Sequence, residues 1–231
     1  MTKYILVGGA RSMKAERSVS LRQRLCELPL GVVGQPLTWP QYVAFLGVPQ
    51  VDTLIALALE VGLCLETSPV ANVPIHAWRA LGQMGTCSAI APLISLLSFP
   101  AIAAIHQELP YVFAYLGPAA LPALANVLSD ARQPLSGRLT ACQALVLLGQ
   151  SSFAATHDCI AVLKTQLAKS LIHPPQLNAV LVEALIGLAA IEAIPVVACA
   201  FSNGRIDTSL TSDWLTVQRR LGLISYAQWQ N

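Results

Sequence analysis

The side chains that most often carry chemistry are few in this chain and are spread along its length. Its six cysteines form no C-x-x-C pair, and its four histidines share no ligand spacing with Asp, Glu or Cys. Structural zinc sites and redox motifs are built from such closely spaced residues. We therefore expect no metal site and no cofactor, and we interpret as surface or helix-capping residues His76, His106, His157 and His173.

Patterns of nucleophilic and acid–base catalysis are also missing. No serine stands in a G-x-S-x-G turn, and no grouping of Cys, His and Asn is evident. The carboxylates are too dispersed to suggest an acid–base pair. Gly8 and Gly9 follow a short apolar stretch, but the G-x-G-x-x-G spacing of a dinucleotide loop is absent. The sequence predicts no catalytic residue and a protein that is not an enzyme.

The composition narrows the classes of partner. Hydrophobic residues make up 55% of the chain and charged residues 11%, whereas an average soluble domain is about 25% charged. Residues 1–27 are basic, and the rest of the chain is close to neutral. Nucleic-acid binding needs a broad cationic surface, so we expect no nucleic-acid partner. Scattered cysteines without a convincing secretory signal predict a cytoplasmic protein.

Four segments repeat one pattern, an apolar helix, a small residue and a second apolar helix that often begins near a proline. These segments are residues 77–97, 112–128, 141–167 and 182–201. The aligned small residues, at intervals of 32, 32 and 40, are Gly85, Gly117, Gly149 and Ala189. A period of this size predicts an all-α solenoid of stacked antiparallel helix pairs, which bury their apolar faces against one another.

The register of the first helices can be predicted from spacing alone. The first unit has Ala77, Ala80, Leu81 and Met84, which match Ala141, Ala144, Leu145 and Leu148 of the third. In the last unit Ala184, Leu185 and Leu188 take the same places. A spacing of i, i+3 and i+4 makes one buried helix face, and alanine allows helices to approach closely.

Four regions follow from this pattern. We expect a basic N-terminal arm over residues 1–36, whose order the sequence leaves open, and a capping helical hairpin over 37–68 that uses Thr38 and Asp52 as helix caps. The repeats occupy 69–203. A C-terminal capping helix and tail occupy 204–231, where Asp213 starts a helix whose Trp214 and Leu221 cover the last repeat.

The segments AWRALGQMGTCSAIAPLISLL and VEALIGLAAIEAIPVVACAF resemble HEAT-like repeats of bacterial and cyanobacterial proteins, including phycobilisome lyase-type HEAT proteins. The segment GRIDTSLTSDWLTVQRRLGL resembles a terminal segment of bacterial HEAT-repeat proteins. The resemblance implies a HEAT-like fold over residues 70–203. It also implies an alternative function, a phycobilin lyase-like or chaperone-like factor acting on a phycobiliprotein. The scarcity of Arg and Lys in the repeats counts against that alternative, because tetrapyrrole propionates call for cationic partners.

Partner-binding positions can be placed on both kinds of helix. On the second helices the positions expected to face away from the core, and so to line an uncharged groove, include Leu96, Asn126, Val127, Gln166 and Cys199. On the first helices an outward stripe of Arg79, Tyr111, Gln143 and Glu183 is expected, with Tyr115 one turn beyond Tyr111. A neutral groove suits another protein's apolar surface. The alternatives are that arms or a second copy cover the groove, and that the tyrosines pack on a neighbouring repeat.

Two charge-free stretches, 80–107 and 109–129, are long enough to cross a bilayer. Prolines interrupt both, so two short helices fit each stretch better than one continuous span. Membrane contact is expected to be peripheral only, through the basic arm. The sequence therefore favours a non-enzymatic helical-repeat scaffold that binds another protein, in the assembly, regulation or stabilisation of a complex.

Overall fold

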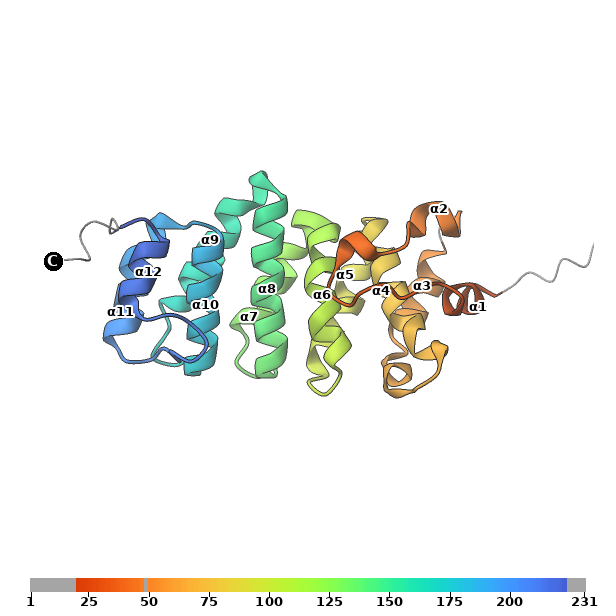
Figure 1. Ribbon diagram of the computed structural model, residues 1–231, viewed down its shortest axis with the longest axis horizontal. Helices are drawn as coiled ribbons and strands as arrows, with labels where there is room; N and C mark the ends of the chain where they lie inside the picture. Colours follow the sequence, from red (N-terminus) through yellow and green to blue (C-terminus); the bar gives the residue numbers. More distant parts are fainter. Residues whose placement is uncertain (1–19, 48–49, 224–231) are drawn as a thin grey trace, which may run out of the picture.

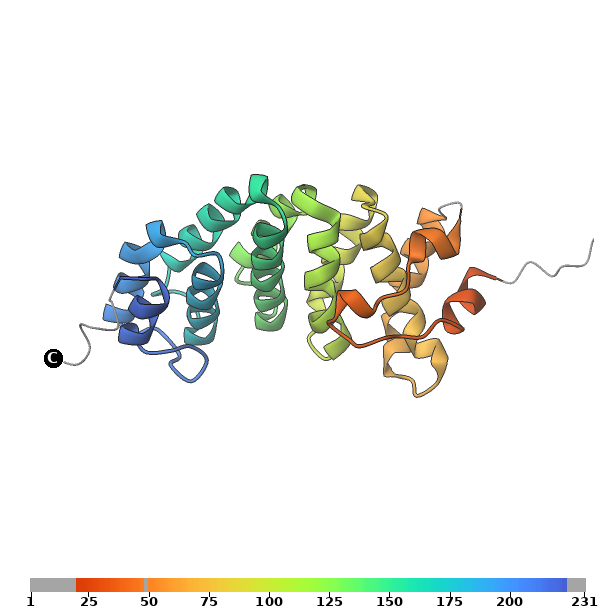
Figure 2. The same ribbon diagram turned by 45° about the horizontal axis from the view of Figure 1, so that its top comes forward.

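The computed structural model describes residues 20–47 and 50–223, and within these ranges the chain is helical and contains no β-strand. The predicted all-α class is confirmed. The helices lie side by side in one elongated row, and a second view shows the row bent into an arc (Figures 1 and 2).

Most helices belong to two layers. In one layer each helix packs against the next, in the order α4 (Val73–Gln83), α6 (Ala103–Leu116), α8 (Leu135–Ser151) and α10 (Pro175–Gly187). The other layer is built in the same way from α5 (Ile90–Ser95), α7 (Leu121–Ser129), α9 (Phe153–Leu167) and α11 (Ile194–Ser202). Contacts of α7 and α9 with α8, and of α9 with α10, join the layers. The first layer carries the predicted first helices.

Short 3₁₀ turns lead into several of these helices and carry the chain between layers. They are η4 (Cys87–Ala89), η5 (Leu96–Ser98), η6 (Gly117–Ala120) and η7 (Ile191–Ala193). A proline stands at the first or second position of α4, α7, α10 and α11. Its fixed φ suits a helix start, and the N–H that it lacks would have no partner within the helix there.

The aligned small residues do not all serve as turns. Gly85, Gly117 and Ala189 have φ of 62°, 76° and 50° and end a first helix, a backbone conformation that favours glycine. Gly149, in contrast, lies inside α8. A Cβ atom there would lie 2.9 Å from Leu188 Cδ2, so this glycine permits close packing and makes no turn.

The predicted core register of the first helices is confirmed. Leu81 and Leu145, at equivalent positions, are completely buried, and the other predicted core residues that are buried are Ala77, Ala80, Ala141, Ala144, Leu148, Ala184, Leu185 and Leu188. Met84 is partly buried and packs against this core. The recurring alanines are buried, and neighbouring first-layer helices pack against one another.

The described part of the N-terminal region packs on the first layer. Its described part, residues 20–36, contains α1 (Leu21–Cys26) and the start of η1 (Pro36–Thr38) and crosses in front of α4 and α6 (Figure 1). The backbone of Leu30 accepts a hydrogen bond from Arg79, and Gly34 N–H donates to Glu108. This segment is therefore packed on the first layer. The basic residues from 1 to 19 lie outside the described residues.

The predicted capping hairpin contains α2 (Tyr42–Leu46), α3 (Val51–Ala58), η2 (Val61–Leu65) and η3 (Pro69–Asn72). The expected caps differ in detail. Thr38 caps no helix, since its hydroxyl bonds to Val32 and Gln35, and the N-cap of α3 is Gln50, with Asp52 in the first turn. Trp78 of α4 donates its indole N–H to the carbonyl of Ala58, 2.8 Å away, which ties α3 to the first layer.

At the other end, α12 (Trp214–Arg220) begins as predicted. Asp213 accepts a 2.7 Å hydrogen bond from the Thr216 N–H, and Trp214 packs on Phe201 of α11 with ring centroids 5.5 Å apart. Val217 and Leu221 are buried. The helix thus covers apolar surface at the end of the row.

One stretch, residues 103–129, is long and apolar enough to cross a membrane by length and composition. It comprises α6, η6 and α7, and Gly117 interrupts it with a φ of 76°. Several of its apolar side chains are buried in the core, among them Leu109, Val112, Phe113, Leu124 and Leu128. These buried residues belong to the hydrophobic core of the structure.

Candidate partner-binding surface

The groove predicted on the second helices is largely wrong. Three of its residues are buried, with side chains exposed by 1% for Leu96, 5% for Val127 and 5% for Gln166. Asn126 and Cys199 are exposed as expected. Asn126 and Val127 do line a shallow pocket of about 320 Å³ between α5 and α7, but no continuous apolar groove of the predicted residues follows this layer.

The error has a simple geometric cause. Leu96 follows the buried Leu93 by three residues, and Val127 follows the buried Leu124 by three. Residues three apart share a helix face, so these positions belong to one broad buried stripe. The helices α5, α7 and α9 each pack both on the first layer and on a neighbouring second helix, and this double packing widens their buried faces.

The stripe on the first helices is closer to the prediction, although Arg79 is completely buried. Its guanidinium binds both carboxylate oxygens of Glu108, with Nε to Oε2 at 2.9 Å and Nη2 to Oε1 at 2.5 Å. It also lies over the Trp39 ring, 5.0 Å from the centroid. Arg79 therefore cannot contact a partner, because residues 30–39 of the same chain cover it.

Tyr111 and Tyr115 remain accessible. Tyr111 is half-buried and Tyr115 is 47% exposed, its ring 5.5 Å from that of Trp39. Both tyrosines line a pocket of about 340 Å³ between α6 and α8, the tyrosine pocket, together with Pro36, Ala114, Leu147, Gln150 and Ser151. Two fully exposed apolar residues, Leu37 and Phe153, are close in sequence to lining residues of this pocket.

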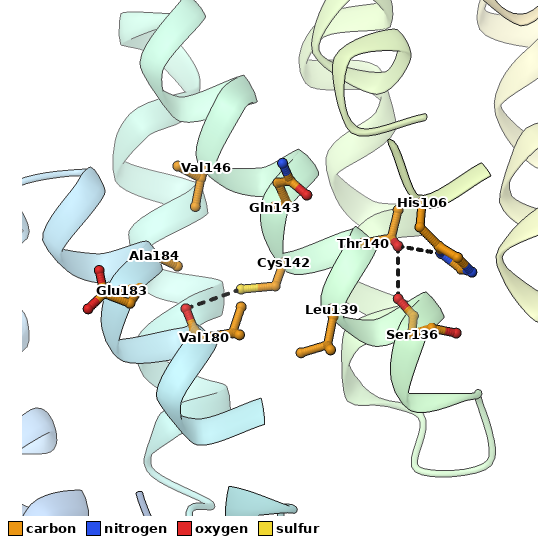
Figure 3. Close-up of a pocket in the computed structure, with 10 residues that line it drawn as sticks. All are labelled: His106, Ser136, Leu139, Thr140, Cys142, Gln143, Val146, Val180, Glu183 and Ala184. Carbon is orange, nitrogen blue, oxygen red and sulfur yellow. Dashed lines mark hydrogen bonds between the residues drawn. The ribbon is translucent and has the colours of Figure 1, made fainter. Parts of the chain in front are cut away.

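A larger pocket of about 490 Å³, the central pocket, crosses the outward face of α8 between α6 and α10. Its lining residues are His106, Ser136, Leu139, Thr140, Cys142, Gln143, Val146, Val180, Glu183 and Ala184 (Figure 3). The lining is mostly apolar and contains no Lys or Arg. Gln143 and Glu183, both in the predicted stripe, lie at its edge. Neither pocket was predicted from the sequence.

Polar groups mark the α6 end of the central pocket. Thr140 Oγ1 donates to the Ser136 carbonyl at 2.8 Å, so it must accept the 2.7 Å hydrogen bond from His106 Nδ1–H. In the neutral ring Nε2 is then an acceptor. Nε2 and Ser136 Oγ are buried and have no hydrogen-bond partner among the described residues. This end of the pocket can accept a hydrogen bond.

At the α10 end of the pocket, the C-terminal segment compensates the charge of Glu183. Glu183 Oε1 accepts hydrogen bonds from Thr211 at 2.6 Å and from Arg220 at 2.8 Å. Burial raises the pKa of Glu183, but these hydrogen bonds outweigh it and hold the pKa below its usual value. The carboxylate is therefore ionised and paired, so the pocket presents a nearly neutral surface.

The buried histidines correct another expectation. His76 and His173, interpreted from sequence as surface or capping residues, are both buried. His76 bonds to Tyr42 Oη at 2.5 Å, and burial and the charge of Arg79 lower its pKa to about 4. His173 lies 3.2 Å from Arg138, and burial together with that charge lowers its pKa. Both rings are neutral links between helices.

The buried cysteines are not activated as nucleophiles. Burial raises the pKa of Cys142 to about 12 and that of Cys159 to about 11, so both thiols are protonated at neutral pH. Across residues 20–47 and 50–223 no three side chains of His, Cys, Asp or Glu are grouped so that they could hold a metal ion.

Comparisons of the chain with family models, with curated proteins and with solved structures find no match. The nearly neutral face of α6, α8 and α10 carries both first-layer pockets, the two largest of the three pockets described above.

Proposed function

We propose that this chain is a non-enzymatic scaffold, a HEAT-like solenoid of helix pairs that binds another protein in the assembly, regulation or stabilisation of a complex. Two features support the HEAT-like assignment. The layers repeat with the helix-pair spacing of the sequence, and Gly85, Gly117 and Ala189 make equivalent turns. Stacked helix pairs of this kind characteristically present extended binding faces.

The observation that carries the proposal is the central pocket. It is open, mostly apolar and free of Lys and Arg, and the tyrosine pocket borders the same helix, since Val146 of α8 lines the central pocket and Leu147 the tyrosine pocket. Exposed apolar surface with aromatic residues beside it is typical of protein interfaces. Of the predicted partner-binding residues, we propose that Tyr111, Tyr115 and Gln143 contact the partner. Asn126 and Cys199 are exposed on the second helices, away from these two pockets.

The test is affinity capture from the native cell, with mass spectrometry, of the wild-type chain and two tryptophan variants. Gln143→Trp fills the mouth of the central pocket from an exposed position, whereas Thr165→Trp adds the same ring to an exposed position of α9 in the other layer. We expect a partner that Gln143→Trp loses and Thr165→Trp keeps. A partner that Thr165→Trp loses and Gln143→Trp keeps would show that the second helices carry the binding face. A partner that both variants capture as the wild type does would exclude both faces as the binding surface.

The phycobilin alternative gains no support from the two pockets on the first layer, because neither is lined by Lys or Arg. A tetrapyrrole carries two propionate groups that such side chains would neutralise. An absorbance titration with bilin separates the two functions. A scaffold leaves the bilin spectrum unchanged, and a shift that Gln143→Trp abolishes would favour the alternative.

A further inference from the structure

Side chains of the first layer already bind the backbone of a non-helical segment of this chain. At the first stripe position, Arg79 donates to the backbone carbonyl of Leu30, and its partner Glu108 accepts from the backbone N–H of Gly34 at 2.9 Å. These two side chains hold one carbonyl and one amide of a non-helical segment. Side chains on the first layer thus bind backbone groups directly.

Segments of the chain itself also contact the second and fourth stripe positions, Tyr111 and Glu183. Tyr111 lies beside the same N-terminal segment, close enough that a Cβ atom at Gly34 would be 3.6 Å from its ring. Glu183 is held by Thr211 and Arg220 of the C-terminal segment. The N-terminal segment therefore covers one end of the stripe and the C-terminal segment covers the other.

The third position, Gln143, is the exception. Its side chain is exposed, makes no hydrogen bond to any described residue, and lies at the edge of the central pocket (Figure 3). A side-chain amide has both a carbonyl acceptor and an N–H donor. It can therefore make with one side chain the two backbone contacts that Arg79 and Glu108 make together.

From this relationship we infer that the central pocket binds an extended, uncharged segment of another protein, whose backbone is held by Gln143 and whose apolar side chains enter between Leu139, Val146 and Val180. The inference deepens the proposed function and rests on it. The absence of Lys and Arg from the pocket and the pairing of its one carboxylate, Glu183, disfavour a charged segment. Continuity with the segment already lying on α4 and α6 favours an extended one.

The experiment selects peptides from a random phage-displayed library on the wild-type chain and then measures their binding to Gln143→Trp. We expect enriched peptides that lack Asp, Glu, Lys and Arg in their core. In fluorescence polarisation, the enriched peptide should lose about tenfold in affinity for Gln143→Ala, the worth of one or two hydrogen bonds. The matched control Thr165→Ala, on the opposite layer, should bind as the wild type does.

A scan of backbone N-methyl groups along the enriched peptide then tests the contact itself. One position should lose about tenfold on the wild type and lose nothing further on Gln143→Ala, because the methyl group and the mutation remove the same hydrogen bond. No enrichment on the wild type would overturn the inference.

The failures of the two proposals are distinguishable. Three results would overturn backbone binding by Gln143 but leave this face as the binding surface. The peptides could be charged, they could bind as helices, or they could bind Gln143→Ala with unchanged affinity while losing affinity for Gln143→Trp. Peptides that also bind Gln143→Trp with unchanged affinity would overturn both. Enriched peptides that are displaced by a synthetic peptide of residues 224–231 would instead identify the chain's own C-terminal residues as the occupant and contradict a partner protein.

Discussion

Arg79 and Glu108 form a completely buried ion pair that joins α4 to α6, 29 residues apart in the chain, with two hydrogen bonds between their side chains. The carbonyl of Leu30 and the N–H of Gly34 complete the hydrogen bonding of the pair from outside. The pair thus connects the N-terminal segment to the first layer at α4 and α6.

Removing one member of this pair should be costly. In Glu108→Leu the guanidinium of Arg79 stays buried without its counter-charge, and we expect the free energy of unfolding to fall by about 3–5 kcal/mol. Chemical denaturation followed by circular dichroism measures the change. The double variant Arg79→Leu, Glu108→Leu should lose less than the single variant, because no charge remains uncompensated. A loss below about 1 kcal/mol in the single variant would show that the pair is not buried.

The stability of the chain should fall in mild acid because of His76. Its pKa is 6.5 when unfolded and about 4 when folded, so below pH 6.5 the unfolded state binds more protons than the folded state. The free energy of unfolding should therefore decrease from pH 6.5 to pH 4, by up to about 3 kcal/mol. His173 acts in the same sense.

The control for that pH dependence is His76→Phe. It removes one titrating group, so denaturation midpoints measured across the same pH range should change less steeply than in the wild type. An identical slope in the variant would contradict the burial of His76.

Replacing Ala189 with glycine should stabilise the fold. It is the non-glycine residue with positive φ among the described positions, and relief of its Cβ strain exceeds the extra chain entropy that glycine brings to the unfolded state. We expect Ala189→Gly to raise the free energy of unfolding by about 0.5–1 kcal/mol. Ala161→Gly, at an exposed helical position of α9, should lower it by a similar amount. Equal losses in both variants would argue against the left-handed turn.

Gly137 should tolerate no side chain. A Cβ atom there would lie 2.3 Å from the carbonyl oxygen of Leu97, so Gly137→Ala must push α8 away from η5. We expect a loss of about 1–3 kcal/mol in thermal or chemical denaturation. Gly187→Ala is the matched control, because its Cβ would meet its nearest neighbour at an ordinary 3.5 Å, and it should be neutral or slightly stabilising. Similar behaviour of the two variants would show that α8 and η5 are not in close contact.

Local spacing was enough to predict the helical class and the core of the first layer. Leu81 and Leu145 are buried at equivalent positions because their helices pack on like neighbours. The second helices were predicted less well, since Leu96 and Val127 are buried by neighbours that lie far away in sequence. The alignment also treated Gly149 as a turn, although its small size serves the contact with Leu188.

The covering of Arg79 was missed for a related reason. The segment that covers it is 49 residues away in the chain, and no local periodicity reports such a contact. A signal was nevertheless present, because Glu108 is the one charged residue between Ala80 and Ser129. A lone carboxylate in an apolar stretch calls for a cationic partner once it is buried, and Arg79 lies immediately before that stretch.

Photo-crosslinking from the face of α8 tests the account most directly. With benzoylphenylalanine placed at position 143 or, as a control, at position 165, the chain is expressed in its native cell, irradiated and examined by mass spectrometry for adducts. We predict a covalent adduct to another protein from position 143 and none from position 165. An adduct from position 165 alone, or from neither position, would contradict a binding surface on the first layer.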